Sequence, residues 1–531
     1  MNDLLIQNGR IIDGTGAPAY TGSLLIRDGK IAAINPENIP ETARVIDAKG
    51  RIVAPGFIDT HSHSSLMVNV EPMLSPKIYQ GITTEILAQD GMGPAPVNEE
   101  TIAPWKKAMS GLEGEWDFDW NWKTVDEYLN QVDTLPLGPN LAYLAPHGNL
   151  RMVVMGLDNR KPTRDELEEM KEELQKAFDA GAYGMSTGMI YPPCVYADTS
   201  EFIELGKVIA KNNGVFVTHQ RSEADAILES MDEIIEIGEK SGCRVHFSHF
   251  KCCGKNNWDK VPAILQKLDD AKAKGIHVSF DSYPYVAGST MMSVILPPWA
   301  HDGGTEKLLE RLNDEEQRAK MKEDIKNGIP GWDNFIDFAG FDGIFITFVK
   351  NPESEQYVGL SLQELGDKTG KVPLDAIFDL IRDEENIIGL VDFYGTEDHI
   401  KEFLQRPEQN VCTDGIIGSK PHPRLYGAFT RVLAKYVRDE GVVSLEEAIR
   451  KMSGKPAEVL GMKDRGLLKE GYAADVLLID PQTVQDKGSY TDPNHLAEGI
   501  DYSMVNGTII IEEGRQIDGR AGQVLRFDRT R

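Results

Sequence analysis

Two histidines stand one residue apart in residues 56–63, GFIDTHSH, immediately after an apolar run. In an extended strand, residues i and i+2 point to the same side, so His61 and His63 would direct two imidazoles toward one spot. Neutral imidazole is a common ligand of zinc and related divalent metals. The pair alone is also compatible with two surface histidines at a strand end, so the other ligand-type residues must decide.

Three further ligand-type residues follow apolar, strand-like runs. His219 ends GVFVTH, His249 follows RVHF within RVHFSHFK, and Asp414 lies in NVCTDG. Parallel strands of a (β/α)8 barrel end at one rim, where active sites lie, so these residues are expected to meet His61 and His63. Four strands that each end in imidazole or carboxylate predict a site for one or two zinc ions, and manganese or cobalt also suit such ligands.

The segments that would position these residues alternate between strand and helix. Helical patterns such as TRDELEEMKEELQKAFDAG, DAILESMDEIIEIGEKSG and VPAILQKLDDAKAKG separate strand-like runs such as GVFVTHQ, RVHFSHF and IHVSFDSYPY. Repeated β–α units of this kind predict a parallel sheet, and a (β/α)8 barrel over residues 55–463 fits the length. A charged stretch at about 300–345 interrupts the rhythm and is expected to form a helical insertion, with a lid as one role open to it.

Both ends of the chain have an all-β texture. Residues 3–53 contain short apolar runs joined by Asn-Gly and Asp-Gly, which is a hairpin signal, and AADVLLID and VNGTIIIEEGRQI near the other end repeat it. We therefore expect a small β-sandwich domain formed from residues 1–54 and 464–531. The predicted fold class is α/β, a metal-dependent barrel with this accessory domain.

Composition excludes several classes of partner. The formal net charge is −28, so binding to nucleic acid or to an anionic membrane surface is not expected. No run approaches 18 apolar residues, and the first residues do not form a signal peptide. Five cysteines in 531 residues do not suggest a disulfide framework, so a reducing cytoplasm is the expected location. The sequence is compatible with a homo-oligomer as well as with a monomer.

The pattern of HxH on the first strand, one histidine on each of two middle strands and an aspartate on the last resembles the amidohydrolase superfamily. Segments along the whole chain, among them PHGNLR, GAYGMSTGMIYPP, THQRSE, DSYPY and HPRLYGAFTRVL, are similar to the N-acyl-D-amino-acid deacylases, or D-aminoacylases. This resemblance implies a zinc-dependent enzyme that hydrolyses the amide bond of N-acyl-D-amino acids, with a small N-acyl amino acid as its substrate.

The chain departs from this family at one expected ligand. Where the deacylases carry a cysteine that binds the tight zinc, this chain has Asp90, within TTEILAQDGMG. A carboxylate is a harder ligand than a thiolate, so metal preference is expected to change. Asp90 as a turn or helix cap is the other interpretation. GAYGMSTGMIYPP also lacks a lysine that could be carboxylated, which points away from the hydantoinase and dihydroorotase branches.

The resemblance also implies roles at the site. Asp414 would take a proton from the attacking water and return it to the leaving amine. The carboxylate of the substrate would be bound by cationic and hydroxyl side chains, namely Lys251, Tyr283, Ser289 and Arg424. Tyr191 is a further candidate for the wall of the substrate cavity. Ordinary packing is the alternative, less favoured interpretation of Lys251 or Tyr283 taken singly, and a structural salt bridge is that of Arg424.

Two other functions fit parts of this pattern. A metal hydrolase of a different amide, such as a β-aspartyl dipeptide or a cyclic imide, would use the same ligands. A non-catalytic barrel that serves as a binding scaffold would be expected to lose ligands, and this chain retains five of the six with Asp90 in place of the sixth.

Overall fold

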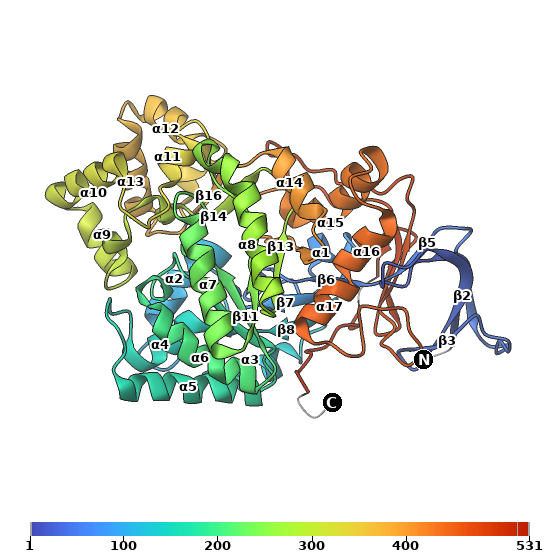
Figure 1. The fold of residues 1–531 in the computed structure, drawn as a ribbon. Helices are drawn as coiled ribbons and strands as arrows, with labels where there is room; N and C mark the ends of the chain where they lie inside the picture. Colours follow the sequence, from blue (N-terminus) through green and yellow to red (C-terminus); the bar gives the residue numbers. More distant parts are fainter. Residues whose placement is uncertain (1–2, 518, 529–531) are drawn as a thin grey trace.

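The computed structural model describes residues 3–517 and 519–528. Its middle alternates parallel strands with helices, and strands from the two chain ends lie together at one side of the molecule (Figure 1). Within the described residues, no helix is long and apolar enough to cross a membrane. The class is therefore α/β, as the sequence predicts.

Nine parallel strands of the middle region form two sheets, and they occupy eight positions because two of them are consecutive along the chain. The first sheet has the order β6-β7-β8, with bounds Phe57–Asp59, Ile82–Leu87 and Asn140–Tyr143. The second has the order β17-β13-β12-β11-β10-β9, with bounds Gln409–Val411, Val278–Ser282, Arg244–Phe247, Val215–His219, Gly184–Gly188 and Ala145–Pro146. Only Leu144 separates β8 from β9, so these two short strands continue one another along the chain.

The carboxyl ends of the first and last parallel strands meet. An isolated parallel bridge joins Ser62 to Gly415, and the Asp414 backbone N–H donates to the His61 carbonyl at 2.9 Å. Residues after β6 and after β17 therefore lie side by side although 351 positions separate His63 from Asp414.

Local sequence explains why these elements form. Strands β10 and β11 are buried along their whole length, which is typical of parallel strands covered on both faces. Helices α5 (Arg164–Asp179), α7 (Ile227–Ser241) and α8 (Val261–Ala273) occupy the three segments predicted as helices. Helix α5 begins with a capping box, in which Thr163 and Glu166 satisfy each other's backbone N–H groups.

Strands from both chain ends share one nine-stranded sheet. Its order is β21-β20-β19-β18-β5-β1-β2-β3, with β4 paired to β1. The N-terminal members are Leu4–Ile11, Tyr20–Arg27, Lys30–Ile34, Arg44–Asp47 and Ile52–Pro55, and the C-terminal members are Val476–Ile479, Ile500–Val505, Thr508–Glu512 and Arg515–Gln516. The antiparallel pair β18–β5 joins the C-terminal strands to the N-terminal strands, so the two chain ends form one continuous sheet.

Residues 287–393, which lie between β13 and β17 in the chain, form a separate layer beside the parallel strands (Figure 1). Helices α9 (Thr305–Leu312), α10 (Glu315–Asn327) and α11 (Phe335–Ala339) lie within the span predicted as helical. A three-stranded antiparallel sheet of order β14-β16-β15 accompanies them, with bounds Ala287–Met291, Ile388–Phe393 and Ile344–Val349, and helices α12 (Leu362–Thr369) and α13 (Pro373–Asp383) follow β15. Strands β14 and β16 also reach the cavity described next.

Candidate metal centre and substrate cavity

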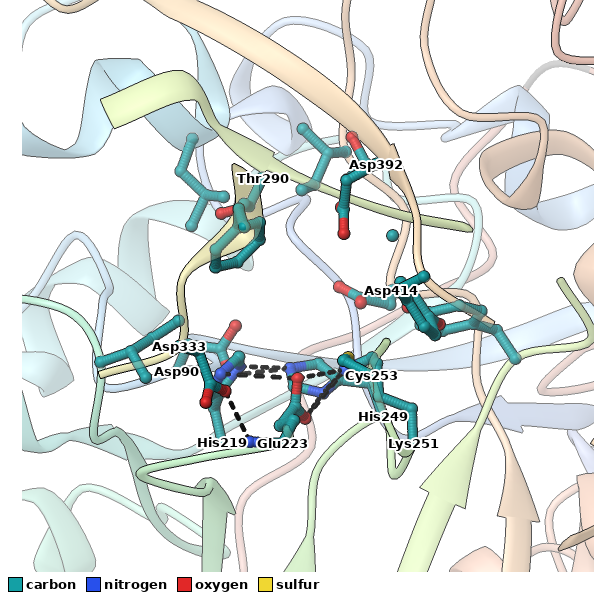
Figure 2. A pocket seen from close by; sticks show the side chains of 18 of the residues that line it. Asp90, His219, Glu223, His249, Lys251, Cys253, Thr290, Asp333, Asp392 and Asp414 are labelled. Atoms are coloured by element: carbon teal, nitrogen blue, oxygen red, sulfur yellow. Dashed lines mark hydrogen bonds and ion pairs between the residues drawn. The ribbon is translucent and has the colours of Figure 1, made fainter. Parts of the chain in front are cut away.

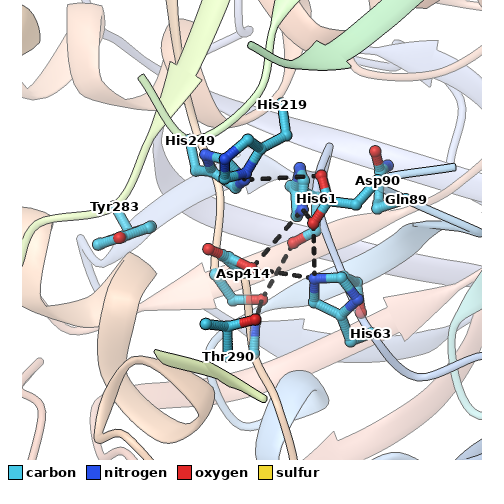
Figure 3. Close-up of polar contacts among 12 residues, drawn as sticks. His61, His63, Gln89, Asp90, His219, His249, Tyr283, Thr290 and Asp414 are labelled. Atoms are coloured by element: carbon cyan, nitrogen blue, oxygen red, sulfur yellow. Dashed lines mark hydrogen bonds and ion pairs between the residues drawn. The ribbon is translucent and has the colours of Figure 1, made fainter. Parts of the chain in front are cut away.

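All six ligand-type side chains lie together at the carboxyl ends of the parallel strands (Figure 3). They come from five strands. His61 and His63 follow β6, Asp90 follows β7, His219 ends β11, His249 follows β12 and Asp414 follows β17. All six are buried. The arrangement is the one that strand-end placement predicts, because parallel strands present their carboxyl ends at one edge.

Four of these residues form one compact group. The Nε2 atoms of His61 and His63 each lie 3.5 Å from Asp90 Oδ2, and they lie 3.6 and 3.1 Å from Asp414 Oδ1. Ligands that bind one zinc ion tetrahedrally at about 2.1 Å stand roughly 3.4 Å from one another. The spacing of this group therefore suits a single divalent ion.

A second group overlaps the first. Asp90 Oδ1 lies 3.6 Å from His249 Nε2, and His249 Nε2 lies 2.9 Å from His219 Nδ1. Ligand atoms of Asp90, His219 and His249 lie within 4.8 Å of one another. Asp90 thus offers one oxygen to each group and would be able to hold an ion in either or both.

Polar atoms left without partners also fit a metal. Both ring nitrogens of His61, and Oδ1 of Asp90, are buried and have no hydrogen-bond partner among the described residues. Buried polar groups are almost always satisfied, so orphaned atoms that face one another call for a missing partner. Imidazole and carboxylate as donors, with no thiolate among them, suit zinc and also the harder manganese and cobalt ions.

The charge of the cluster points the same way. Burial and Lys251 act to lower the pKa of His249, but Glu223 and Asp414 outweigh them and raise it to about 10. The carboxylates around this ring therefore stabilise a positive charge. A divalent cation provides that charge when the imidazole binds in its neutral form.

Backbone conformation at three of the ligands is unusual. Asp90, His249 and Asp414 have φ values of 56°, 34° and 48°, in the left-handed region that residues with a Cβ rarely adopt. Such strained positions collect at functional sites, where the surrounding fold holds them. At His249 part of that support is visible, because its backbone N–H donates to the buried Asp281 carboxylate at 2.5 Å.

Asp414 is held in its ionised form. Burial alone would raise its pKa, but the guanidinium of Arg424, 2.9 Å from Asp414 Oδ2, together with the nearby histidines holds the pKa of this carboxyl well below its usual range. Its other oxygen, Oδ1, is 3.1 Å from His63 Nε2. An ionised carboxylate beside the ligand cluster is able to accept a proton from water bound there.

The residues predicted to bind substrate line one cavity together with members of this cluster. Figure 2 shows Lys251 of this set beside His249. The lining includes Lys251, Tyr283, Ser289, Arg424 and Tyr191. Arg424 is fully buried over the Tyr283 ring, and one of its N–H groups donates to the Ser289 carbonyl at 2.9 Å. A second nitrogen, Nη1, forms the ion pair with Asp414, and Nε has no partner among the described residues, so only the Nε side of the guanidinium is free for a ligand.

Two of these residues are more engaged than the sequence suggests. The Tyr191 hydroxyl shares a hydrogen bond with Thr290 at 2.8 Å, and Tyr283 shares one with Tyr394, also at 2.8 Å. Arg424 forms an ion pair with Asp414, so the salt bridge considered as its alternative role is present.

Glu223 is a member of the site that the sequence analysis did not select. Its carboxylate accepts from Lys251 Nζ at 2.9 Å through both oxygens and lies 3.2 Å from His249 Nδ1. It is buried beside two candidate ligands, His219 and His249. A carboxylate behind a metal-binding histidine fixes its ring orientation, so Glu223 links the ligand cluster to the substrate side. The available signal was its place in THQRSE, four residues after His219.

We expect Asp90→Ala to weaken retention of metal, because it removes an oxygen from both ligand groups. Asp90→Cys restores a single soft donor and should retain metal with a preference shifted toward zinc. Metal content after dialysis against a graded series of chelator concentrations, measured by mass spectrometry, tests both changes. Equal metal retention by Asp90→Ala and the unchanged protein would remove Asp90 from the ligand set.

Comparison with known proteins gives matches over nearly the whole chain. The sequence pattern of the amidohydrolase family, Amidohydro_3, matches residues 44–332 and 400–511. The N-acyl-D-glutamate deacylase of Alcaligenes xylosoxydans xylosoxydans is 33% identical over 530 residues, which covers 99% of this chain and 97% of that protein. The D-aminoacylase of the same organism is 32% identical and covers 98% of this chain and 97% of its own.

Solved structures are similar as well. An N-acyl-D-glutamate deacylase from Bordetella bronchiseptica, in complex with zinc and a phosphonate inhibitor that mimics the tetrahedral intermediate, has a TM-score of 0.83 at 33% identity, with 99% of both chains covered. A structure of D-aminoacylase that concerns the functional role of its binuclear metal centre has a TM-score of 0.82 at 31% identity and covers 99% of this chain and 100% of that chain.

Proposed function

Because this chain belongs to the amidohydrolase family, within its branch of N-acyl-D-amino-acid deacylases, we propose that it hydrolyses N-acyl-D-amino acids to a carboxylate and a free D-amino acid. The observation that carries the proposal is the meeting of six ligand-type side chains at one end of a cavity that also holds Lys251 and Arg424. Metal ligands beside cations suit a substrate with both an amide and a carboxylate.

The residues would hold one or two zinc ions, with manganese or cobalt as the alternatives. His61, His63 and Asp90 would hold one ion, and His219 and His249, with Asp90 shared, the other. A divalent ion bound there polarises the amide carbonyl and makes water a stronger nucleophile near neutral pH.

Asp414 would carry the proton through the reaction. Its ionised carboxylate lies beside the ligand cluster and would take one proton as the water oxygen bonds to the carbonyl carbon. The same proton would pass to the nitrogen as the carbon–nitrogen bond breaks, so the leaving group departs as a neutral amine. Arg424 would keep the carboxylate oriented between these two transfers.

Binding of the α-carboxylate would set the stereochemistry. Lys251, Tyr283, Ser289 and Arg424 line the cavity beside the ligand cluster, and Tyr191 forms part of its wall. With the carbonyl held at the ligand cluster and the carboxylate held by the cations, the side chain is directed to one wall only. The relatives that act on D-amino acids indicate that this wall accepts the D hand.

The finer architecture follows from the same family. We infer that the eight parallel strands close into a (β/α)8 barrel within residues 55–463, as the bridge from Ser62 to Gly415 suggests. Residues 1–54 and 464–531 would make the β-sandwich domain, and residues of about 300–345 would be a helical insertion in the barrel domain. The protein would act in the cytoplasm.

A substrate panel tests the proposed function. We expect hydrolysis of N-acetyl-D-amino acids with little or none of the L enantiomers, measured as release of free amine. Activity confined to β-aspartyl dipeptides or cyclic imides would favour the other hydrolase function. No turnover of any amide by the metal-loaded protein would favour a binding scaffold.

We expect Arg424→Met to lower kcat/KM for N-acetyl-D-amino acids by about 30-fold or more, since a buried charge clamp contributes about 2–5 kcal/mol. Arg424 also pairs with Asp414, so part of the loss will be common to every substrate. The ratio of kcat/KM for a free-carboxylate substrate to that for its carboxamide isolates the clamp, and it should fall in the variant. Arg424→Lys, which keeps the charge near Asp414, is the matched control. An unchanged ratio would contradict the clamp.

A further inference from the structure

Asp392 is a buried carboxyl that neither the metal cluster nor the proposed carboxylate clamp uses. It lies on β16, the central strand of the three-stranded sheet, with 2% of its surface exposed. Its side chain lines the substrate cavity, and Figure 2 shows the carboxyl pointing into it from the side away from His219 and Glu223.

The fold leaves space in front of this carboxyl. Asp392 is the cross-strand partner of Gly288 on β14, and side chains of directly paired residues share one face of a sheet. A Cβ on Gly288 would stand 2.8 Å from Asp392 Oδ1. Glycine at this position therefore leaves room for the carboxyl in the wall of the cavity that both residues line.

Apart from Asp90 of the candidate metal centre, each other acid that lines this cavity has a partner. Asp414 pairs with Arg424, and Glu223 with Lys251. Asp333 accepts from the Ser222 hydroxyl and from a backbone N–H, both at 2.6 Å.

Asp392 is different, because its carboxylate makes no hydrogen bond or ion pair with another side chain in the part of the chain that the structure describes. Burial raises its pKa to about 7, although Lys251 and Arg424 act against this. A hydrogen bond from its own backbone N–H also acts to lower the pKa. A buried carboxyl with no side-chain partner is costly to keep, and a donor or cation that enters the cavity would stabilise its charged form.

From this geometry we propose that Asp392 is a specificity-determining residue that accepts a cationic side chain of the substrate, such as that of an N-acyl-D-lysine or N-acyl-D-ornithine. The inference rests on the proposed function and refines its substrate class. With the amide at the ligand cluster and the α-carboxylate at Lys251 and Arg424, the side chain is the substituent left to meet Asp392. An acidic side chain would instead meet a carboxyl of the same sign.

The test compares side chains of matched length. For the metal-loaded protein, kcat/KM is measured on N-acetyl-D-lysine, N-acetyl-D-norleucine and N-acetyl-D-glutamate. We expect the lysine substrate to exceed norleucine by about tenfold or more, the scale of one charge-assisted hydrogen bond. The glutamate substrate should be the poorest.

Asp392→Asn keeps the shape and removes the charge. It should abolish the preference for lysine over norleucine, leave the norleucine rate nearly unchanged and improve the glutamate rate. Asp392→Glu should keep the preference. Asp333→Asn is the matched control, because that carboxyl already has two donors, and it should change the lysine-to-norleucine ratio little.

The outcomes separate the two proposals. If the protein hydrolyses N-acyl-D-amino acids but Asp392→Asn lowers all three rates by one factor, the role of Asp392 in specificity is wrong and the proposed function stands. A preference of the unchanged protein for N-acetyl-D-glutamate would also overturn this role. If the unchanged protein hydrolyses no N-acyl-D-amino acid of any kind, the proposed function itself is wrong.

Discussion

Asp414→Asn is expected to lower kcat by about 10²–10⁴-fold, the usual contribution of a positioned general base. The amide keeps the shape of the side chain but cannot accept the proton at neutral pH. KM should change less, since Arg424 and Lys251 remain in place to hold the substrate. The measurement is steady-state hydrolysis of an N-acetyl-D-amino acid with metal content determined on the same sample.

Metal content is needed because Asp414 also lies within reach of two ligand histidines. A fall in bound metal that accounts for the loss of activity would make Asp414 chiefly a ligand. Asp333→Asn is the matched change in the same cavity, since Asp333 already accepts from Ser222 and from a backbone N–H, and the kcat of this variant should stay within a few-fold. Near-normal kcat in fully metal-loaded Asp414→Asn would exclude the proposed proton transfer.

The ligand cluster could be predicted from sequence because topology does most of the positioning. An apolar run that ends in a single histidine or aspartate marks the carboxyl end of a strand, and parallel strands bring those ends to one edge. His219 and His249 are two such cases, on strands that pair in register. The three helices between strands were also predictable, because their buried residues recur at helical spacing.

Glu223 and Asp392 could not be found in the same way. Glu223 lies in a loop after β11, and its contacts with Lys251 and His249 depend on how that loop folds back. Asp392 lies on β16, whose partners on β14 and β15 are about 100 and 45 positions away in the chain. Such non-local antiparallel pairs leave no periodic signal in the intervening sequence, so the sheet around the predicted helices was missed.

Arg424 shows a different limit of sequence reasoning. Its residue type suggested either a substrate clamp or a structural salt bridge, and the structure places it where both roles are open. One nitrogen meets Asp414, another donates to the Ser289 carbonyl, and Nε has no partner among the described side chains and backbone. A planar group with five N–H donors can divide them among partners, which residue type alone does not reveal.

Removal of metal is expected to reduce amide hydrolysis to background, and zinc, cobalt or manganese should restore it. The orphaned nitrogens of His61 and Oδ1 of Asp90 are the structural reason, since they have no hydrogen-bond partner among the described residues. Metal should also raise the melting temperature of the apo-protein, because an ion that binds only the folded state stabilises it by mass action. That readout does not depend on catalysis.

His61→Asn should weaken both responses to metal. His246→Asn is the control, because His246 is a buried histidine whose nitrogens already meet Ser279 and Asp281. Full activity in a sample verified to be free of metal would exclude the mechanism.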